Sequence, residues 1–288
     1  MTMAGSSPAG TIAVGDLPVQ RLGFGAMRIS VARDAAGARD PAMARALVRH
    51  AVDRGVTFLD TANIYGLGRS EELIAEALHP YPTGLVIGTK SGYEVRRLAP
   101  GERRLPASGR PGHLKDECDK SLRRLRLDQL DLYQLHTPDP AVPYAESLGA
   151  LVELQQQGKV RHIGISNVTT GQLAEALSIC GIVSVQNRYN AGDRESEPLL
   201  EMCERHGIAF IPWQPLVRDQ TRLRVAEEIA RAHRATAQQV VLAWLLRRSP
   251  VMLPIPGTTS LAHLDANIDA AWIELTDDEF ARLGAGAS

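Results

Sequence analysis

The sequence predicts a (β/α)8 TIM barrel, an α/β fold in which eight parallel strands alternate with helices. Apolar strand-like runs alternate with amphipathic helical stretches along the chain, and eight such pairs can be counted. No Pro/Gly-rich linker or change of composition divides the 288 residues. Barrels of this length fold as one domain, although about 150 residues per domain is the usual prior. We therefore expect one barrel domain over 11–288, after a flexible tail over 1–10.

The first element expected is a β-hairpin, because strand-like runs at 11–14 and 17–19 flank the turn dipeptide Gly15-Asp16. Barrel strands are apolar or β-branched runs bounded by turn residues, and we expect them at 22–26, 57–60, 85–90, 130–136, 162–166, 184–187, 209–212 and 252–255. Helices with one apolar face are expected at 41–54, 70–78, 111–126, 144–157, 170–179, 197–206, 221–232 with 236–248, and 261–270. Thr276 and Glu279 form a capping-box pattern, which predicts a short C-terminal helix over 276–283.

Composition argues against polymer and membrane partners. The chain has 32 basic and 33 acidic residues, so no global field attracts nucleic acid or an acidic membrane surface. The apolar run 240–246 is far shorter than the ~20 residues that span a bilayer. Residues 1–10 lack a signal-peptide pattern, and the three cysteines include no C-x-x-C pair. We expect a cytoplasmic protein, a monomer or small homo-oligomer, with no metal.

Three expected strands end in Asp60, Lys90 and His136, and Tyr65 follows the first of them. The chemistry of such barrels lies at the C-terminal ends of the strands. Each residue alone has an ordinary explanation as a cap, a solvated strand end or a loop histidine. Burial raises the pKa of a carboxylic acid unless a cation holds the charged form, and Lys90 is placed to be that cation for Asp60. Together they predict a catalytic set.

These segments resemble the aldo-keto reductase family, and the similarity extends from Leu17 to Leu283. Residues 55–66 with Ser70-Glu71, the strand end Thr89-Lys90, and 130–136 resemble its catalytic segments. Residues 164–168, residues 186–190 and the stretch from 255–260 through Asn267 resemble the cofactor-binding segments of the family. The stretch 155–167, with 242–246 and 262–264, is similar to short-loop bacterial members, a group that includes pyridoxal reductases.

The resemblance implies reduction of an aldehyde or ketone by NADPH, with Tyr65 as general acid. A free phenol, with a pKa near ~10, donates its proton reluctantly at neutral pH. We expect the Lys90 ammonium to lower that pKa, and Asp60 to hold the ammonium in place. His136 would donate a hydrogen bond to the substrate carbonyl.

The resemblance also assigns residues to the cofactor. The nicotinamide would be bordered by the backbone of Gly25, Ala26 and Met27 and would stack on Trp213, where many members have tyrosine. Its carboxamide would be bound by Ser166, Asn167 and Gln186, and Asp60 also belongs to the expected cofactor site. The phosphates would meet Gln214, Pro215, Leu216 and Arg218, together with Ile255, Gly257, Thr258, Thr259, His263 and Asn267 around a helix N-terminus.

Two features qualify the cofactor assignment. Gly23-Phe-Gly25 lacks a third glycine and opens into no helix, so a Rossmann site is not supported. Many relatives direct basic residues at the adenosine 2′-phosphate, but between Gly257 and Asn267 only His263 could be a cation. We still expect NADPH rather than NADH.

The substrate is expected to be a small carbonyl compound, with pyridoxal-like compounds among the candidates. Met27, Tyr93 and Trp213 are the expected pocket walls. The loop 91–112 carries five arginines, which either form part of the rim or are simply solvated.

Three other functions remain open at this stage. One is a cofactor-binding regulatory module, as in the potassium-channel β subunits that resemble this family, which steady turnover of NADPH would exclude. Another is a Schiff-base lyase that uses Lys90, which borohydride trapping would reveal. A paired-carboxylate glycosidase is weaker, because Asp60 is the single carboxylate that ends an expected strand.

Overall fold

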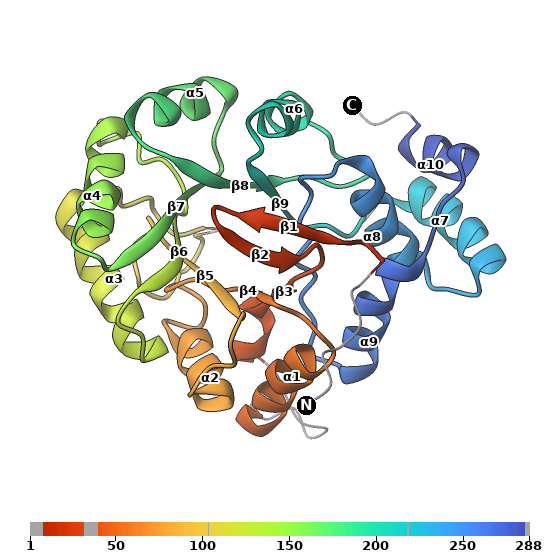
Figure 1. The fold of residues 1–288 in the computed structure, drawn as a ribbon, viewed down its shortest axis with the longest axis horizontal. Helices are drawn as coiled ribbons and strands as arrows, with labels where there is room; N and C mark the ends of the chain where they lie inside the picture. The colour runs from red at the N-terminus through yellow and green to blue at the C-terminus, as the bar shows by residue number, and fades with distance from the viewer. Residues whose placement is uncertain (1–7, 32–39, 103, 218, 286–288) are drawn as a thin grey trace.

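The computed structural model describes residues 8–31, 40–102, 104–217 and 219–285. An antiparallel hairpin, β1 (Thr11–Val14) and β2 (Leu17–Gln20), lies across one end of a ring of parallel strands that helices surround (Figure 1). Seven parallel strands follow one another around the ring in sequence order: β3 (Phe24–Gly25), β4 (Phe58–Asp60), β5 (Val86–Ser91), β6 (Leu130–Leu135), β7 (Val160–Ser166), β8 (Ile182–Arg188) and β9 (Ala209–Trp213). The predicted barrel and its hairpin are confirmed.

The eighth position of the ring differs from the prediction, because 252–255 is not a regular strand. It makes one isolated bridge, between Phe210 and Met252. The segment still closes the ring: Leu253 N donates to Phe210 O at 2.8 Å on one side, and Gly23 N donates to Pro254 O at 2.9 Å on the other. Pro254 and Pro256 have no N–H group, so a continuous ladder cannot form there.

The helices pack around the outside of the ring, and most of their predicted bounds are correct to within one or two residues. They are α1 (Pro41–Asp53), α2 (Arg69–Leu78), α3 (Pro111–Leu125), α4 (Tyr144–Gln156), α5 (Thr170–Ile179), α6 (Glu197–His206), α7 (Gln220–His233), α8 (Ala237–Arg248), α9 (Leu261–Asp269) and α10 (Asp277–Gly284). Thr276 and Glu279 form the predicted capping box of α10. Two 3-10 helices, η1 (Ala26–Val31) and η2 (Ala270–Trp272), were not predicted from the sequence.

The hairpin closes the N-terminal end of the barrel. Its turn residue Asp16 pairs with Arg161 and His162, which lie at the start of β7. Val14 and Val19 are buried in the apolar cluster that fills the inside of the barrel. The opposite end, where the strands finish, is therefore the end left for ligands.

The expected flexible tail over 1–10 lies largely outside the described residues, which begin at Pro8. The carbonyls of Ala9 and Gly10 accept hydrogen bonds from Arg21, so these two residues are attached to the fold. No helix in the described part of the chain has the length and apolar character needed to cross a membrane.

The seam that closes the ring depends on two glycines. A Cβ atom on Gly25 would lie 2.5 Å from the carbonyl oxygen of Ile255, and one on Gly257 would lie 2.6 Å from that of Gly25. We predict that Gly25→Ala lowers the free energy of unfolding by ~1–3 kcal/mol, because β3 and the closing segment must move apart.

Gly149→Ala is the matched control, because Gly149 lies in α4 with no atom within 4 Å of the added Cβ. It should raise the free energy of unfolding by ~0.5–1 kcal/mol. Chemical denaturation measures both changes. Equal stability of Gly25→Ala and the wild-type protein would contradict the prediction.

Candidate active site

The alternation of side chains along a strand explains why the predicted catalytic residues share the inside of the barrel. Three strands each place an apolar side chain in the interior cluster, at Phe58, Val86 and Leu132. Asp60, Lys90 and His136 follow these by two, four and four positions, so they face the same side of the sheet. The interior therefore changes from apolar to polar toward the C-terminal ends of the strands.

Lys90 is fully buried and its ammonium is paired with Asp60. Its Nζ donates to Asp60 Oδ2 at 2.7 Å and to the carbonyl oxygen of Thr61 at 2.8 Å. Burial alone would lower the pKa of Lys90, but the neighbouring oxygens of Asp60 and Tyr65 outweigh burial and raise it above the ordinary value. Lys90 therefore stays charged. A charged amine cannot attack a carbonyl, which argues against the Schiff-base alternative.

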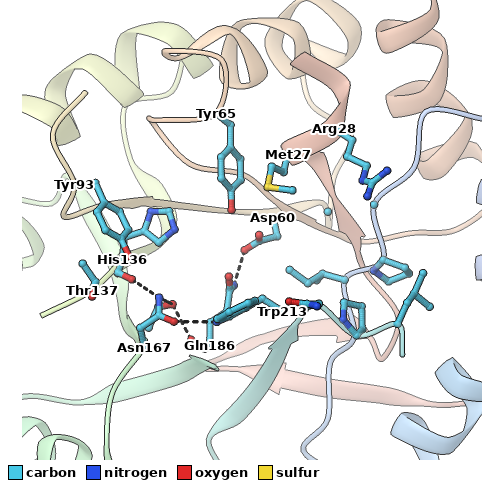
Figure 2. A pocket seen from close by; sticks show the side chains of 18 of the residues that line it. Met27, Arg28, Asp60, Tyr65, Tyr93, His136, Thr137, Asn167, Gln186 and Trp213 are labelled. Atoms are coloured by element: carbon cyan, nitrogen blue, oxygen red, sulfur yellow. Dashed lines mark hydrogen bonds between the residues drawn. The ribbon is translucent and has the colours of Figure 1, made fainter. Parts of the chain in front are cut away.

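Tyr65 extends from the loop after β4 toward Asp60 (Figure 2). The Nζ atom of Lys90 lies 5.3 Å from the centre of its ring. Burial raises the pKa of Tyr65 above that of a free phenol, and the opposing charge of Lys90 does not overcome burial. Lys90 acts on this pKa in the expected direction, but burial is the larger effect and the pKa lies above that of a free phenol. Tyr65 holds its proton at neutral pH, next to a cation that can stabilise the phenolate.

The loop that carries Tyr65 is fixed by buried polar contacts. Asn63 Nδ2 donates to Glu117 Oε2 at 2.9 Å, which ties the loop to α3. Thr61 Oγ1 donates to Ser70 Oγ at 2.9 Å, and Ser70 Oγ donates to the carbonyl of Ala26 at the same distance. These bonds link the loop to α2 and to the start of η1, so Tyr65 has a defined position.

His136 lies between two tyrosine rings. The ring centres of Tyr65 and Tyr93 are 6.1 Å and 4.8 Å from that of His136, both edge-on. Burial and the charge of Lys90 lower the pKa of His136 well below 6.5, so the imidazole is neutral and carries one N–H. Its buried Nδ1 has no hydrogen-bond partner among the described residues.

These side chains border a cavity of about 860 Å³ at the C-terminal end of the barrel. Most of the predicted site residues line it: Gly25, Met27, Asp60, Tyr65, Tyr93, His136, Ser166, Asn167, Gln186, Trp213, Gln214, Pro215, Leu216, Ile255 and Gly257. Lys90 lies behind the wall, in contact with Asp60. Within the described ranges, no group of three or more His, Cys, Asp and Glu side chains could hold a metal ion.

Two amides connect the wall of the cavity to the catalytic set. Asn167 accepts a hydrogen bond from the indole N–H of Trp213 at 3.0 Å and donates to the carbonyl of His136 at 2.9 Å. Gln186 Nε2 donates to Asp60 Oδ1 at 2.9 Å. Trp213 is thereby held in one orientation, and Asp60 has a partner on each of its oxygens.

Several predicted cofactor residues do not line the cavity. Ala26 is fully buried next to it. Thr258 and Thr259, just before α9, and His263 and Asn267, within α9, do not line it. The hydroxyl of Thr258 accepts from Ser260 N at 3.1 Å, so it is used within the turn. Arg218 lies outside the described residues.

Five further residues line the cavity but were not predicted individually from the sequence: Arg28, Arg104, Thr137, Val217 and Pro256. Arg28 directly follows the predicted Met27, but the turn of η1 that places it was not foreseen. Arg104 belongs to the arginine-rich loop, where charge alone did not distinguish it from its neighbours.

Comparison with known proteins identifies the class of this barrel. The sequence model of the aldo/keto reductase family matches residues 21–286. The chain is 40% identical over 280 residues to an uncharacterized oxidoreductase of Schizosaccharomyces pombe, covering 96% of this chain and 90% of that protein. It is 39% identical over 284 residues to pyridoxine 4-dehydrogenase of Escherichia coli, covering 95% and 96%.

A solved structure gives the same result. The crystal structure of an aldo-keto reductase from Klebsiella pneumoniae in complex with NADPH matches with a TM-score of 0.77 and 28% identity, covering 92% of this chain and 90% of that one. The chain belongs to the aldo/keto reductase family, and it is an oxidoreductase.

The neutral state of His136 predicts a pH dependence of stability. The unfolded chain binds a proton at this histidine below about pH 6.5, whereas the folded protein does not. The free energy of unfolding should therefore fall as the pH drops below about 6.5, by up to ~1.4 kcal/mol per pH unit from this group.

Denaturation of the ligand-free protein between pH 5 and 8 measures this dependence. His136→Gln should reduce the slope below pH 6.5, whereas His206→Gln, at an exposed position in α6, should leave it unchanged. An identical slope in His136→Gln and the wild-type protein would show that His136 takes up its proton equally in both states.

Proposed function

We propose that this protein reduces a small aldehyde or ketone to the alcohol with NADPH, and that Tyr65 is the general acid. The observation that carries the proposal is the meeting of Tyr65, His136 and the Lys90–Asp60 pair at one cavity, although they come from three different strand ends. Membership in the aldo/keto reductase family supports the reaction class.

The residues of the cavity fit a nicotinamide cofactor. Asn167 fixes the indole of Trp213, which can offer a flat face to a planar ring. Gln186 donates an N–H group to Asp60, and its Oε1 accepts no hydrogen bond from any described side chain, so this oxygen is available to a carboxamide N–H. The N-terminus of α9 and the cationic Arg28 are suited to phosphates. The K. pneumoniae relative in complex with NADPH supports the same choice.

When bound, the cofactor supplies a hydride to the carbonyl carbon. Tyr65 would donate its phenolic proton to the carbonyl oxygen as negative charge develops there. The ammonium of Lys90 would stabilise the resulting phenolate, and Asp60 would keep that ammonium in position. Neutral His136 would donate its single N–H to the carbonyl oxygen and orient it. Positioned proton transfer of this kind is typically worth ~10²–10⁴-fold in rate.

The substrate we propose is a small carbonyl compound that contacts Met27, Tyr93 and Trp213. All three side chains line the cavity, and Tyr93 packs against the catalytic imidazole. The relative from E. coli is a pyridoxine 4-dehydrogenase, which keeps pyridoxal-like compounds among the candidates.

The role of Tyr65 is tested by Tyr65→Phe, which removes the acidic hydroxyl and keeps the ring. We predict a loss of reduction of at least ~10²-fold, with little change in NADPH binding. Steady-state consumption of NADPH with a panel of aldehydes measures the rate, and fluorescence titration measures the binding.

Tyr144→Phe is the control, because the Tyr144 hydroxyl lies away from the cavity in α4 and has no partner among the described residues. Undiminished turnover by Tyr65→Phe would remove Tyr65 from the acid role. A wild-type protein that binds NADPH but reduces no aldehyde would favour the regulatory-module alternative.

Cofactor choice is tested by titration with NADPH and NADH, followed by tryptophan fluorescence. We predict tighter binding of NADPH, and a loss of most of the quenching in Trp213→Phe. Trp272→Phe is the control, because Trp272 is 66% exposed and does not line the cavity. Equal affinity for the two cofactors would contradict the preference for NADPH.

A further inference from the structure

In the arginine-rich loop between β5 and α3, both glutamates pair with the same arginine, Arg96. Arg96 donates to Glu94 at 2.9 Å and makes a two-pronged contact with Glu102, at 2.7 Å and 2.8 Å. Neither glutamate makes a hydrogen bond or ion pair with another described arginine. The described arginines Arg97, Arg104 and Arg110 are therefore not neutralised by these two glutamates.

Arg104 lines the cavity, and its side chain makes no hydrogen bond or ion pair with any residue that the structure describes. The chain as a whole is nearly neutral, with a formal charge of −1, so this cation does not reflect a generally basic surface. An unpaired guanidinium on the wall of a ligand cavity offers a fork of N–H donors to an anion.

The backbone around Arg104 is held against the catalytic end of the cavity. Tyr93 and Ala107 form an antiparallel bridge, and Glu94 N donates to the carbonyl of Pro106 at 3.0 Å. The ring of Tyr93 is 4.8 Å from that of His136. Arg104 therefore lines the cavity from a segment whose backbone pairs with Tyr93 and Glu94, next to the imidazole that would orient the carbonyl.

The other charges of the cavity already have functions. Asp60 is the single carboxylate among the described wall residues, and Lys90 and Gln186 occupy its two oxygens. Arg28 lies at the opposite end of the cavity from Tyr93 and His136 (Figure 2), toward the segments proposed to meet the cofactor phosphates. Arg104 is the cation that remains for the substrate.

We infer that Arg104 binds an anionic group, a carboxylate or a phosphate, on the carbonyl substrate. This inference rests on the proposed reductase function and specifies its substrate class. The guanidinium forms an ionic hydrogen bond to the anion while His136 and Tyr65 face the carbonyl oxygen. Such a bond acts equally in the bound substrate and in the transition state, so it lowers KM and leaves kcat nearly unchanged.

Matched aldehydes test the inference. 4-Carboxybenzaldehyde and methyl 4-formylbenzoate differ in one negative charge, and pyridoxal 5′-phosphate and pyridoxal differ in one phosphate. The wild-type enzyme should have a higher kcat/KM for the anionic member of at least one pair. Arg104→Gln should reduce that value about tenfold, mainly through KM, and leave the neutral member unchanged. Arg104→Lys should restore part of the preference.

Arg97→Gln is the matched control, because Arg97 is an exposed arginine of the same loop that does not line the cavity. It removes the same charge and should keep the wild-type preference. The preferred pair distinguishes a carboxylate from a phosphate. The absence of preference in both pairs, or an equal loss for anionic and neutral members in Arg104→Gln, would overturn the inference.

A binding measurement separates this inference from the reductase proposal. Titration with 4-carboxybenzyl alcohol in the presence of NADP⁺, read by tryptophan fluorescence, should show weaker binding in Arg104→Gln than in Arg97→Gln. If no aldehyde is reduced but this difference is found, the reductase function fails and the anion site stands. If aldehydes are reduced but binding is equal in the two variants, the anion site fails alone.

Discussion

The ion pair between Lys90 and Asp60 is the constraint on which the site depends. Two charges are removed from water, which is costly unless each finds partners in a good geometry. The structure satisfies this requirement: Lys90 donates to Asp60 and to the Thr61 carbonyl, and Gln186 occupies the second oxygen of Asp60. Removing one partner of such a pair typically costs ~3–5 kcal/mol, because the other charge stays buried and unpaired.

A permanently charged ammonium near a protonated phenol also explains how burial can serve acid catalysis. Burial alone makes Tyr65 a weaker acid than a free phenol. It also excludes water from the surroundings of Lys90, where electrostatic interactions are stronger than in a wet site. Lys90 therefore stabilises Tyr65 most strongly after the phenol has given up its proton. Burial, together with the charge of the same ammonium, also lowers the pKa of His136 and keeps its imidazole neutral.

Features that depend on strand periodicity could be predicted from the sequence, whereas features that depend on long-range contacts could not. Asp60, Lys90 and His136 could be placed together because the ends of parallel strands converge, and the structure brings them to one cavity. The prediction of an eighth strand was wrong because Pro254 and Pro256 interrupt its hydrogen-bond ladder, although the segment keeps its place in the ring.

The environments of individual side chains were harder to predict from the sequence. The direction of the pKa shift of Tyr65 depends on the balance between burial and one charge, which sequence spacing does not give. Arg104 differs from Arg96, which is paired with Glu94 and Glu102, and from Arg97, which does not line the cavity. No local sequence pattern reveals these differences.

The β1–β2 hairpin at the N-terminal end of the barrel has a kinetic consequence. With that end closed by the hairpin and the apolar cluster beneath it, the ligands of the cavity enter and leave from the C-terminal side of the barrel. When two ligands share one entrance to a cavity, the ligand that binds deeper must bind first and leave last. Where one ligand lies deeper than the other, the closed far end of the barrel constrains the order of addition and release, at a distance from every residue proposed to take part in the chemistry.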